Sequence, residues 1–154
     1  MNEFTGRYFH ALDPKGRLKF PSSFREGLKQ EHSVYLSYGV SQCLTVYPAS
    51  VWRAQVERLK TITETDGEAF DYRRTKFASA QECELDSQGR LLIPAHIRSL
   101  AGISRDVAVI GNLDVVEVWD KARWEEYFKQ SLEQHYENAR KVPPLKASQQ
   151  QEGK

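Results

Sequence analysis

The sequence predicts an α+β fold in which two similar units pack on each other as an intramolecular pseudo-dimer. Residues 12–25 return, 73 positions later, as residues 85–98, with Leu, Asp, Gly, Arg, Leu, Pro and Arg in register. A second alignment pairs residues 43–52 with residues 115–124 at an offset of 72, a difference that one residue in a loop absorbs. Units too small to bury a core alone can bury one by packing together.

Each unit is expected to contain a strand, a turn, a strand, a short helix, two strands and a longer helix that opens with Trp. In the first unit, residues 13–16 (Asp-Pro-Lys-Gly) fit a type I turn: Asp accepts backbone hydrogen bonds, Pro presets φ and Gly tolerates a left-handed φ. Leu18 and Phe20 then alternate with Lys19, so we expect the apolar pair to face inward and Lys19 outward.

The second turn, residues 86–89 (Asp-Ser-Gln-Gly), keeps the Asp and the Gly and should turn in the same way without the stiffness of Pro. Leu92 stands where the first unit has Lys19, so we expect this face of the second unit to be buried. The residues expected to structure the two turns are Asp13, Gly16, Asp86 and Gly89.

Further elements follow each turn. Pro21 and Pro94 suit the first position of a short helix, where a missing N–H costs little. Four strands are expected, at residues 34–38, 44–47, 106–110 and 115–119, with the last two forming a hairpin.

Between the units, residues 50–63 and 68–77 show helical periodicity and form a connector with an apolar seam. Arg73, Arg74 and Lys76 cluster there; we interpret them as a solvated helix face, and contact with nucleic acid stays open as the alternative.

After the second unit, Trp124, Tyr127, Phe128 and Leu132 form an aromatic helical stripe, to be covered either by the same chain or by a neighbouring subunit. We therefore predict repeat 1 at 7–51, a helical connector at 52–79, repeat 2 at 80–123, a C-terminal helix at 124–142 and a disordered tail at 143–154.

Composition indicates a single cytoplasmic body. The 154 residues are 40% hydrophobic, and neither a signal peptide nor a run of about 18 apolar residues is present. Cys43 and Cys83 lack metal-ligand spacing, so we expect buried thiols. No catalytic arrangement involves the four scattered histidines, and we expect no enzyme, cofactor, metal, membrane partner or small-molecule substrate.

Charge is distributed unequally between the repeats although the net charge is only +1. Residues 5–25 carry five basic residues against Asp13, a local +4, whereas residues 78–98 carry two basic residues against three acidic ones, a local −1. The first repeat is therefore the better candidate for binding phosphate.

The pattern Asp-x-x-Gly-Arg-Leu-x-Phe/Ile-Pro, present twice around a helical connector, resembles the MraZ family, and the resemblance extends from about residue 7 to about residue 128. It implies two AbrB-like swapped-hairpin domains in a pseudo-dimer barrel. It also implies a nucleoid-associated bacterial transcriptional regulator that binds double-stranded DNA at repeated boxes upstream of the operon for cell division and cell-wall synthesis, and that forms ring-like homo-oligomers.

Carried onto this chain, the family's Asp-x-x-x-Arg element falls on Asp13 with Arg17 and on Asp86 with Arg90. A guanidinium can bond guanine bidentately, so Arg17 is our candidate for a base contact. The residues expected to bind DNA are Arg7, Lys15, Arg17, Lys19 and Arg90, with the first repeat making most of the contact and Arg7, Lys15 and Lys19 on phosphate.

Structural roles compete with these assignments. Asp13 is expected to pair with Arg17 across its own turn, because a carboxylate repels phosphate. Arg25 and Arg98 recur in register on the short helices, where an ion pair within the protein is an equal possibility. The alternative function is an antitoxin-like or scaffold module whose tail, with Val142 and Leu145, contacts another protein.

Overall fold

A computed structural model describes residues 3–146 of the chain, which divide into two compact units, 3–121 and 122–146. The first unit contains eight strands: β1 (Arg7–Ala11), β2 (Arg17–Lys19), β3 (Val34–Tyr38), β4 (Leu44–Pro48), β5 (Gln81–Cys83), β6 (Arg90–Leu92), β7 (Asp106–Asn112) and β8 (Val115–Asp120). Its helices are α1 (Ser22–Lys29), α2 (Ala49–Leu59), the 3-10 turn η1 (Glu64–Asp66), α3 (Glu68–Ala78) and α4 (Ala95–Leu100). The strands and helices expected from the sequence are thereby confirmed, with shifts of a few residues at their ends.

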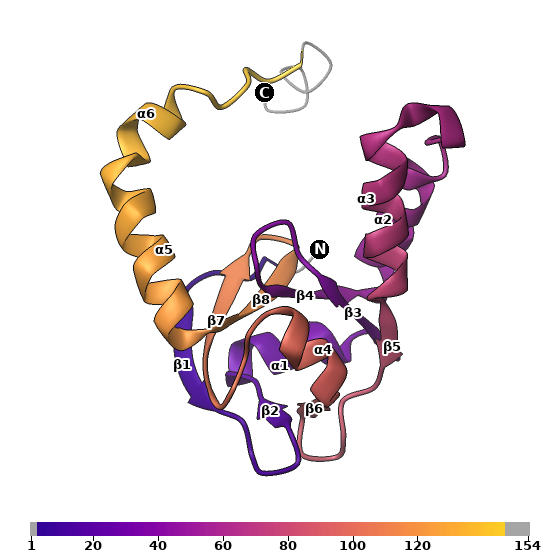
Figure 1. Cartoon of the computed structure of the whole chain (residues 1–154). Helices are drawn as coiled ribbons and strands as arrows, with labels where there is room; N and C mark the ends of the chain where they lie inside the picture. The colour runs from indigo at the N-terminus through magenta and orange to yellow at the C-terminus, as the bar shows by residue number, and fades with distance from the viewer. Residues whose placement is uncertain (1–2, 147–154) are drawn as a thin grey trace, which may run out of the picture. The chain divides into compact units, whose positions relative to one another are not determined.

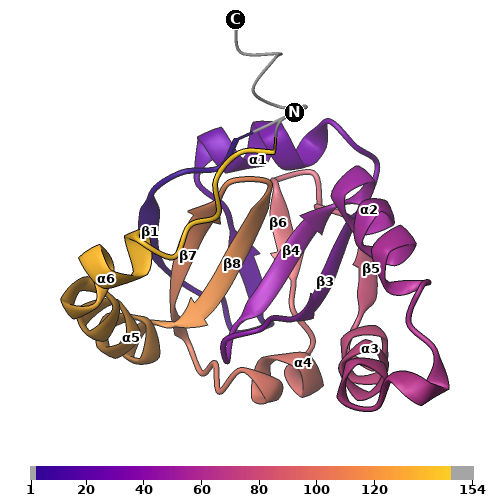
Figure 2. The same cartoon turned by 90° about the horizontal axis from the view of Figure 1, so that it is seen from above.

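Six strands form one antiparallel sheet in the order β1-β7-β8-β4-β3-β5, which Figure 2 shows from above. The other two, β2 and β6, pair with each other in a separate antiparallel ribbon. Figure 1 shows the ribbon below the sheet with the two turns side by side at its end, and Figure 2 shows α1 and α4 on opposite sides of the body. The first unit is thus an α+β body built from both repeats.

The repeats exchange strands across the body. β1 of the first repeat pairs with β7 of the second, and β5 of the second pairs with β3 of the first. The two registers correspond: Tyr8 faces Val109, and the residues 73 positions from them, Gln81 and Leu36, also face each other. Each repeat therefore contributes one strand, β1 or β5, that pairs with a strand of the other repeat.

The ribbon follows the same twofold relation. Leu18 faces Leu91, which is its own counterpart 73 positions later, and both side chains are fully buried. Around this pair, the core includes Phe20, Ile93 and Ile97. Burying such side chains is worth roughly 1.5–3 kcal/mol each, so the ribbon joins the repeats through their common core.

Two sequence expectations about individual positions are wrong. Leu92 is 53% exposed rather than buried, because the outer face of a two-stranded ribbon has no further layer of protein on it. Pro21 and Pro94 precede their helices with extended ψ values of 147° and 148°, as N-cap residues rather than first helical residues. Either place suits a residue without an N–H.

The connector differs from expectation at Lys76, which is 2% exposed and not on a solvated face. Its Nζ donates to the carbonyl of Tyr38 (3.2 Å) and to the hydroxyl of Tyr47 (2.5 Å). Burial lowers the pKa of Lys76 to about 8. Arg73 donates to the carbonyl of Ile62 (2.6 Å), whereas Arg74 is exposed and pairs with Asp71, so the solvated face is confirmed for Arg74.

The second unit contains α5 (Lys121–Glu133), apart from its first residue, and α6 (His135–Ala139), so the predicted C-terminal helix is broken at Gln134. Within α5, Trp124 stacks on Phe128 with ring centroids 5.2 Å apart. Tyr127 and Leu132 are 42% and 55% exposed. The tail predicted at 143–154 lies outside the described residues from 147 onward, and the domain boundaries drawn from the sequence stay predictions.

No helix in the part of the chain that the structure describes is long and apolar enough to cross a membrane. Cys43 is buried and Cys83 is half-buried, and both are free thiols.

Candidate nucleic-acid interface

The first turn is held by the residues that the sequence singled out. The amide of Gly16 donates to the carbonyl of Asp13 (2.9 Å), and Gly16 has φ of +86°. The Asp13 carboxylate accepts the amides of Lys15 (2.9 Å) and Arg17 (2.8 Å). It also accepts Nε of Arg17 (2.5 Å), so the expected pair across the turn is present.

The second turn repeats this geometry. Gly89 has φ of +74° and donates to the carbonyl of Asp86 (2.9 Å). The Asp86 carboxylate accepts the amides of Gln88 and Arg90 and, at 2.8 Å, Nε of Arg90. The two turns are therefore alike in backbone and differ in the side chains around them.

Both carboxylates are held in their charged form. The amide of Arg17 is the main cause that lowers the pKa of Asp13, and its guanidinium and the Lys15 amide act in the same direction. The pKa of Asp86 is lowered in the same way, first by the amide of Arg90. Each arginine is thus fixed at Nε by its own turn, and the Nη groups lie outside that contact.

The ribbon places three cations on one surface. Arg17 faces Leu92 and Lys19 faces Arg90, and these four residues alternate with the buried Leu18 and Leu91 along the two strands. Because side chains alternate between faces, all four belong to the outer face. Cβ atoms of such facing pairs are about 4.5–5.5 Å apart, so the cations form one patch.

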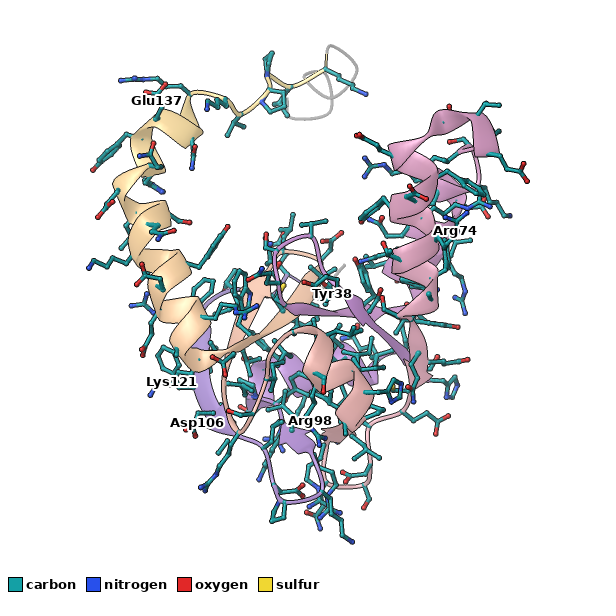
Figure 3. The ribbon with its side chains drawn as sticks, viewed as in Figure 1. Tyr38, Arg74, Arg98, Asp106, Lys121 and Glu137 are labelled. Carbon is teal, nitrogen blue, oxygen red and sulfur yellow. The ribbon has the colours of Figure 1, made fainter. Side chains whose placement is uncertain are left out.

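Contacts between the repeats hold the first turn. Arg90 of the second repeat approaches the carboxylate of Asp13, with Nη1 3.9 Å from Oδ2. The amide of Ile93 donates to the carbonyl of Gly16 (2.9 Å). Arg98, which Figure 3 marks on α4, donates from Nη1 to the carbonyl of Ile93 (2.5 Å) beside Gly16. The first turn therefore rests on three residues of the second repeat.

Arg25 lies against Gly89 of the second turn, as Arg98 lies against Gly16 of the first. A Cβ on Gly89 would lie 2.6 Å from Cδ of Arg25. The structure gives neither Arg25 nor Arg98 a salt bridge with a described acidic residue, so the ion pair considered for them is absent from residues 3–146. Their role is to cover the glycine of the opposite turn.

A groove of about 740 Å³ lies beside the first turn. Its charged lining residues are Asp13, Arg17, Lys19, Arg90, Arg98 and Arg105. Five of these are basic and one is acidic, and the acidic one is already paired with two guanidinium groups. Three of the five cations, Arg90, Arg98 and Arg105, come from the second repeat, although the charge distribution in the sequence favours the first.

The other predicted DNA-binding residues lie around this groove. Lys15 is exposed at the tip of the first turn but does not line the groove. Arg7 begins β1, four residues before Ala11 and the turn, and is not part of the groove. The structure thus brings Arg17, Lys19 and Arg90 together and leaves Arg7 apart.

Arg105 is the groove residue that the sequence analysis missed. Its carbonyl accepts the amide of Leu12 (2.9 Å), which fixes the segment before β7 against the start of the first turn. Comparison of the two repeats outside the turns would have revealed it, since the residue 73 positions earlier is His32. No group of three potential metal-ligating side chains occurs among residues 3–146.

Comparison with known proteins agrees with the duplication. The model of a family described as "MraZ protein, putative antitoxin-like" matches residues 4–73 and again residues 76–142. A Transcriptional regulator MraZ of Heliobacterium modesticaldum is 40% identical over 139 residues, covering 90% of this chain and 96% of the relative. The protein of the same name from Pelotomaculum thermopropionicum is 40% identical over 142 residues, covering 92% and 97%. That from Acetivibrio thermocellus is 43% identical over 124 residues, covering 80% and 85%. The double match and these relatives show that the chain belongs to the MraZ family.

Proposed function

We propose that this protein is a transcriptional regulator that binds specific double-stranded DNA sites through the outer face of the β2–β6 ribbon and the adjoining groove. The observation that carries the proposal is the joint placement of Arg17, Lys19 and Arg90 on one exposed face. The relatives' name supports the regulatory role and belongs to no enzyme class.

The shape of the surface suits the DNA major groove. That groove is about 12 Å wide and admits a two-stranded β-ribbon. Arg17 is fixed at Nε by Asp13, so its Nη groups are the donors for a guanine edge. Lys15 and Lys19 carry charge without such a fixed partner acid among residues 3–146 and suit backbone phosphate.

The remaining features of the proposal rest on the resemblance. The exchanged pairing of β1 with β7 and β5 with β3 supports an AbrB-like swapped-hairpin barrel. The proposed target is a set of repeated boxes upstream of the operon for cell division and cell-wall synthesis, bound on the nucleoid in the cytoplasm. A ring of identical subunits would convert weak contacts into avidity of about 10²–10⁴ when the spacing of boxes matches.

A second candidate is an interaction module that binds another protein rather than specific DNA. A groove of about 590 Å³ between α2 and α3 favours it, because Val56, Phe70 and Phe77 present apolar surface there. The family's description as antitoxin-like is compatible with such a role.

The deciding experiment titrates the purified full chain against labelled DNA from upstream of its own operon, at several salt concentrations and with unrelated competitor DNA. We expect specific binding that weakens steeply with salt. Arg17→Ala should lose about 10- to 100-fold in specific affinity, the effect of a bidentate base contact worth about 1–3 kcal/mol.

Arg90→Ala should weaken binding less than Arg17→Ala. Loss of binding with Arg90→Ala together with its survival in Arg17→Ala would show that the second turn reads the DNA. Absence of binding at any salt, with a protein recovered in stoichiometric amount, would favour the interaction module instead.

A further inference from the structure

We infer that Arg105, supplied by the second repeat, binds a DNA backbone phosphate next to Lys19 and completes a DNA-binding surface shared by both repeats. This inference rests on the proposed function and extends it to a residue outside both turn motifs. Four observations support it, and the duplication provides an internal control for the last two.

The first observation is position. The Arg105 carbonyl accepts the amide of Leu12, the residue just before Asp13, and Arg105 lines the same groove as Arg17 and Lys19. Lys19 and Arg105 line the groove from segments that are 86 residues apart in the chain. They can therefore act together only in the folded body.

The second observation concerns the exposure and the ion pairing of Arg105. The residue is exposed and makes no salt bridge with a described acidic side chain. Arg17 and Arg90, by contrast, are held by Asp13 and Asp86. Its guanidinium presents a planar fork of donors, which suits a phosphate.

The third observation is the corresponding cavity of the other half. A pocket of about 190 Å³ is lined by Leu85, Glu31 and His32, which stand 73 positions from Leu12, Ser104 and Arg105 of the groove. Glu31 accepts the amide of Ser50 (3.0 Å) and so caps the start of α2. In that half, the pocket equivalent to the groove therefore contains a residue that stabilises a helix of the protein itself.

The fourth observation is the pattern of differences between the repeats. The turns themselves share their hydrogen bonds, their glycine conformation and their Asp–Arg pair. Around the first turn and its groove, Lys15, Lys19 and Arg105 have no Lys or Arg counterpart on the second side, where Gln88, Leu92 and His32 stand. Two of the three come from the motif, and Arg105 completes the set from the far repeat.

The test compares Arg105→Ala, Arg105→Gln and Arg105→Lys with the unaltered chain in the same salt titration. A lost phosphate contact lowers the magnitude of the slope of log K against log salt by about 0.9. We expect this decrease, with several-fold weaker binding to specific and unrelated DNA alike, in Arg105→Ala and Arg105→Gln. Arg105→Lys should retain the slope, because the ammonium of Lys also neutralises one phosphate.

Arg58→Ala is the matched control, since Arg58 is an exposed arginine on α2 outside the groove. If Arg105→Ala behaves as Arg58→Ala while the unaltered chain binds its own DNA, the inference about Arg105 is wrong and the proposed function stands. If the unaltered chain shows no DNA binding, the proposed function itself fails. A change in the ratio of specific to unrelated affinity in Arg105→Ala would instead assign Arg105 to base reading and overturn the phosphate contact.

Discussion

The guanidinium of Arg98 covers Gly16, and a side chain at Gly16 would occupy the same space. A Cβ there would overlap Nη1 of Arg98, lie 2.9 Å from its Cζ and stand 3.0 Å from the carbonyl of Ile93. Arg98 belongs to α4 of the second repeat and Gly16 to the turn of the first. The absence of a side chain at Gly16 therefore allows one repeat to support the turn of the other.

Gly16→Ala should destabilise the fold and weaken DNA binding together. The positive φ of +86° costs a non-glycine residue about 1–3 kcal/mol, and Arg98 must leave the Ile93 carbonyl. We expect denaturant unfolding to report that loss and DNA affinity to fall by about tenfold, roughly 1.4 kcal/mol.

Gly67→Ala separates the two effects. Gly67 also has a positive φ, of +57°, but a Cβ there would meet no atom within 4 Å. The Gly67→Ala variant should have a lower free energy of unfolding because of backbone strain, and its DNA affinity should be unchanged. Equal losses of DNA affinity in the two variants would refute the supporting role of Arg98.

Asp13→Asn should reduce the specificity of DNA binding more than its strength. The Asn oxygen can still accept the amides of Lys15 and Arg17, so the turn persists. The charge that holds Arg17 is lost, and one repulsion toward phosphate is removed. We expect binding to unrelated DNA to rise a few-fold and the ratio of specific to unrelated affinity to fall, as measured by competition.

The same substitution at Asp86 provides the comparison. Asp86→Asn frees Arg90 rather than Arg17, so the specificity ratio should change less. A larger change with Asp86→Asn would transfer the reading role to the second turn.

Lys76 predicts a pH dependence of stability. Its pKa is lowered by burial from 10.5 to about 8, so between these pH values the unfolded chain binds more protons than the folded chain. The contribution of Lys76 to the free energy of unfolding therefore rises with pH across this window, by about 3 kcal/mol at 1.36 kcal/mol per pKa unit.

Lys76→Met isolates this effect from its neighbours. Burial raises the pKa values of Cys43 and Tyr47 to about 12, which lowers stability at alkaline pH in both proteins. The difference in unfolding free energy, unaltered chain minus Lys76→Met, should therefore increase from pH 8 to pH 10. A difference that stays flat in urea titrations would show that the pKa of Lys76 is not lowered in the folded protein.

Basic residues added around the second turn should strengthen DNA binding on that side of the protein. A triple variant, His32→Arg, Gln88→Lys and Leu92→Lys, gives the side of the second turn basic residues at the positions equivalent to Arg105, Lys15 and Lys19. We expect a steeper salt dependence and tighter binding to unrelated DNA, because more phosphates are neutralised. The variant His32→Gln with Leu92→Gln changes the same surface without charge and should bind as the unaltered chain does.

Local sequence determined much of this protein. Asp13 and Gly16 specify their turn because its hydrogen bonds and positive φ involve only residues within four positions. Alternation predicted that Leu18 lies inward and Lys19 outward, and helical periodicity predicted the connector. The repeat itself predicted that two halves share one core.

Tertiary structure decided what depends on distant partners. The exposure of Leu92 follows from the lack of a layer outside the ribbon, and the burial of Lys76 follows from contact with β3 and β4. Arg98 and Arg105 reach the first turn only because the repeats exchange strands. Spacing along one chain specifies local hydrogen bonds and side-chain faces, whereas the environment of a charge depends on which distant segments surround it in the folded body.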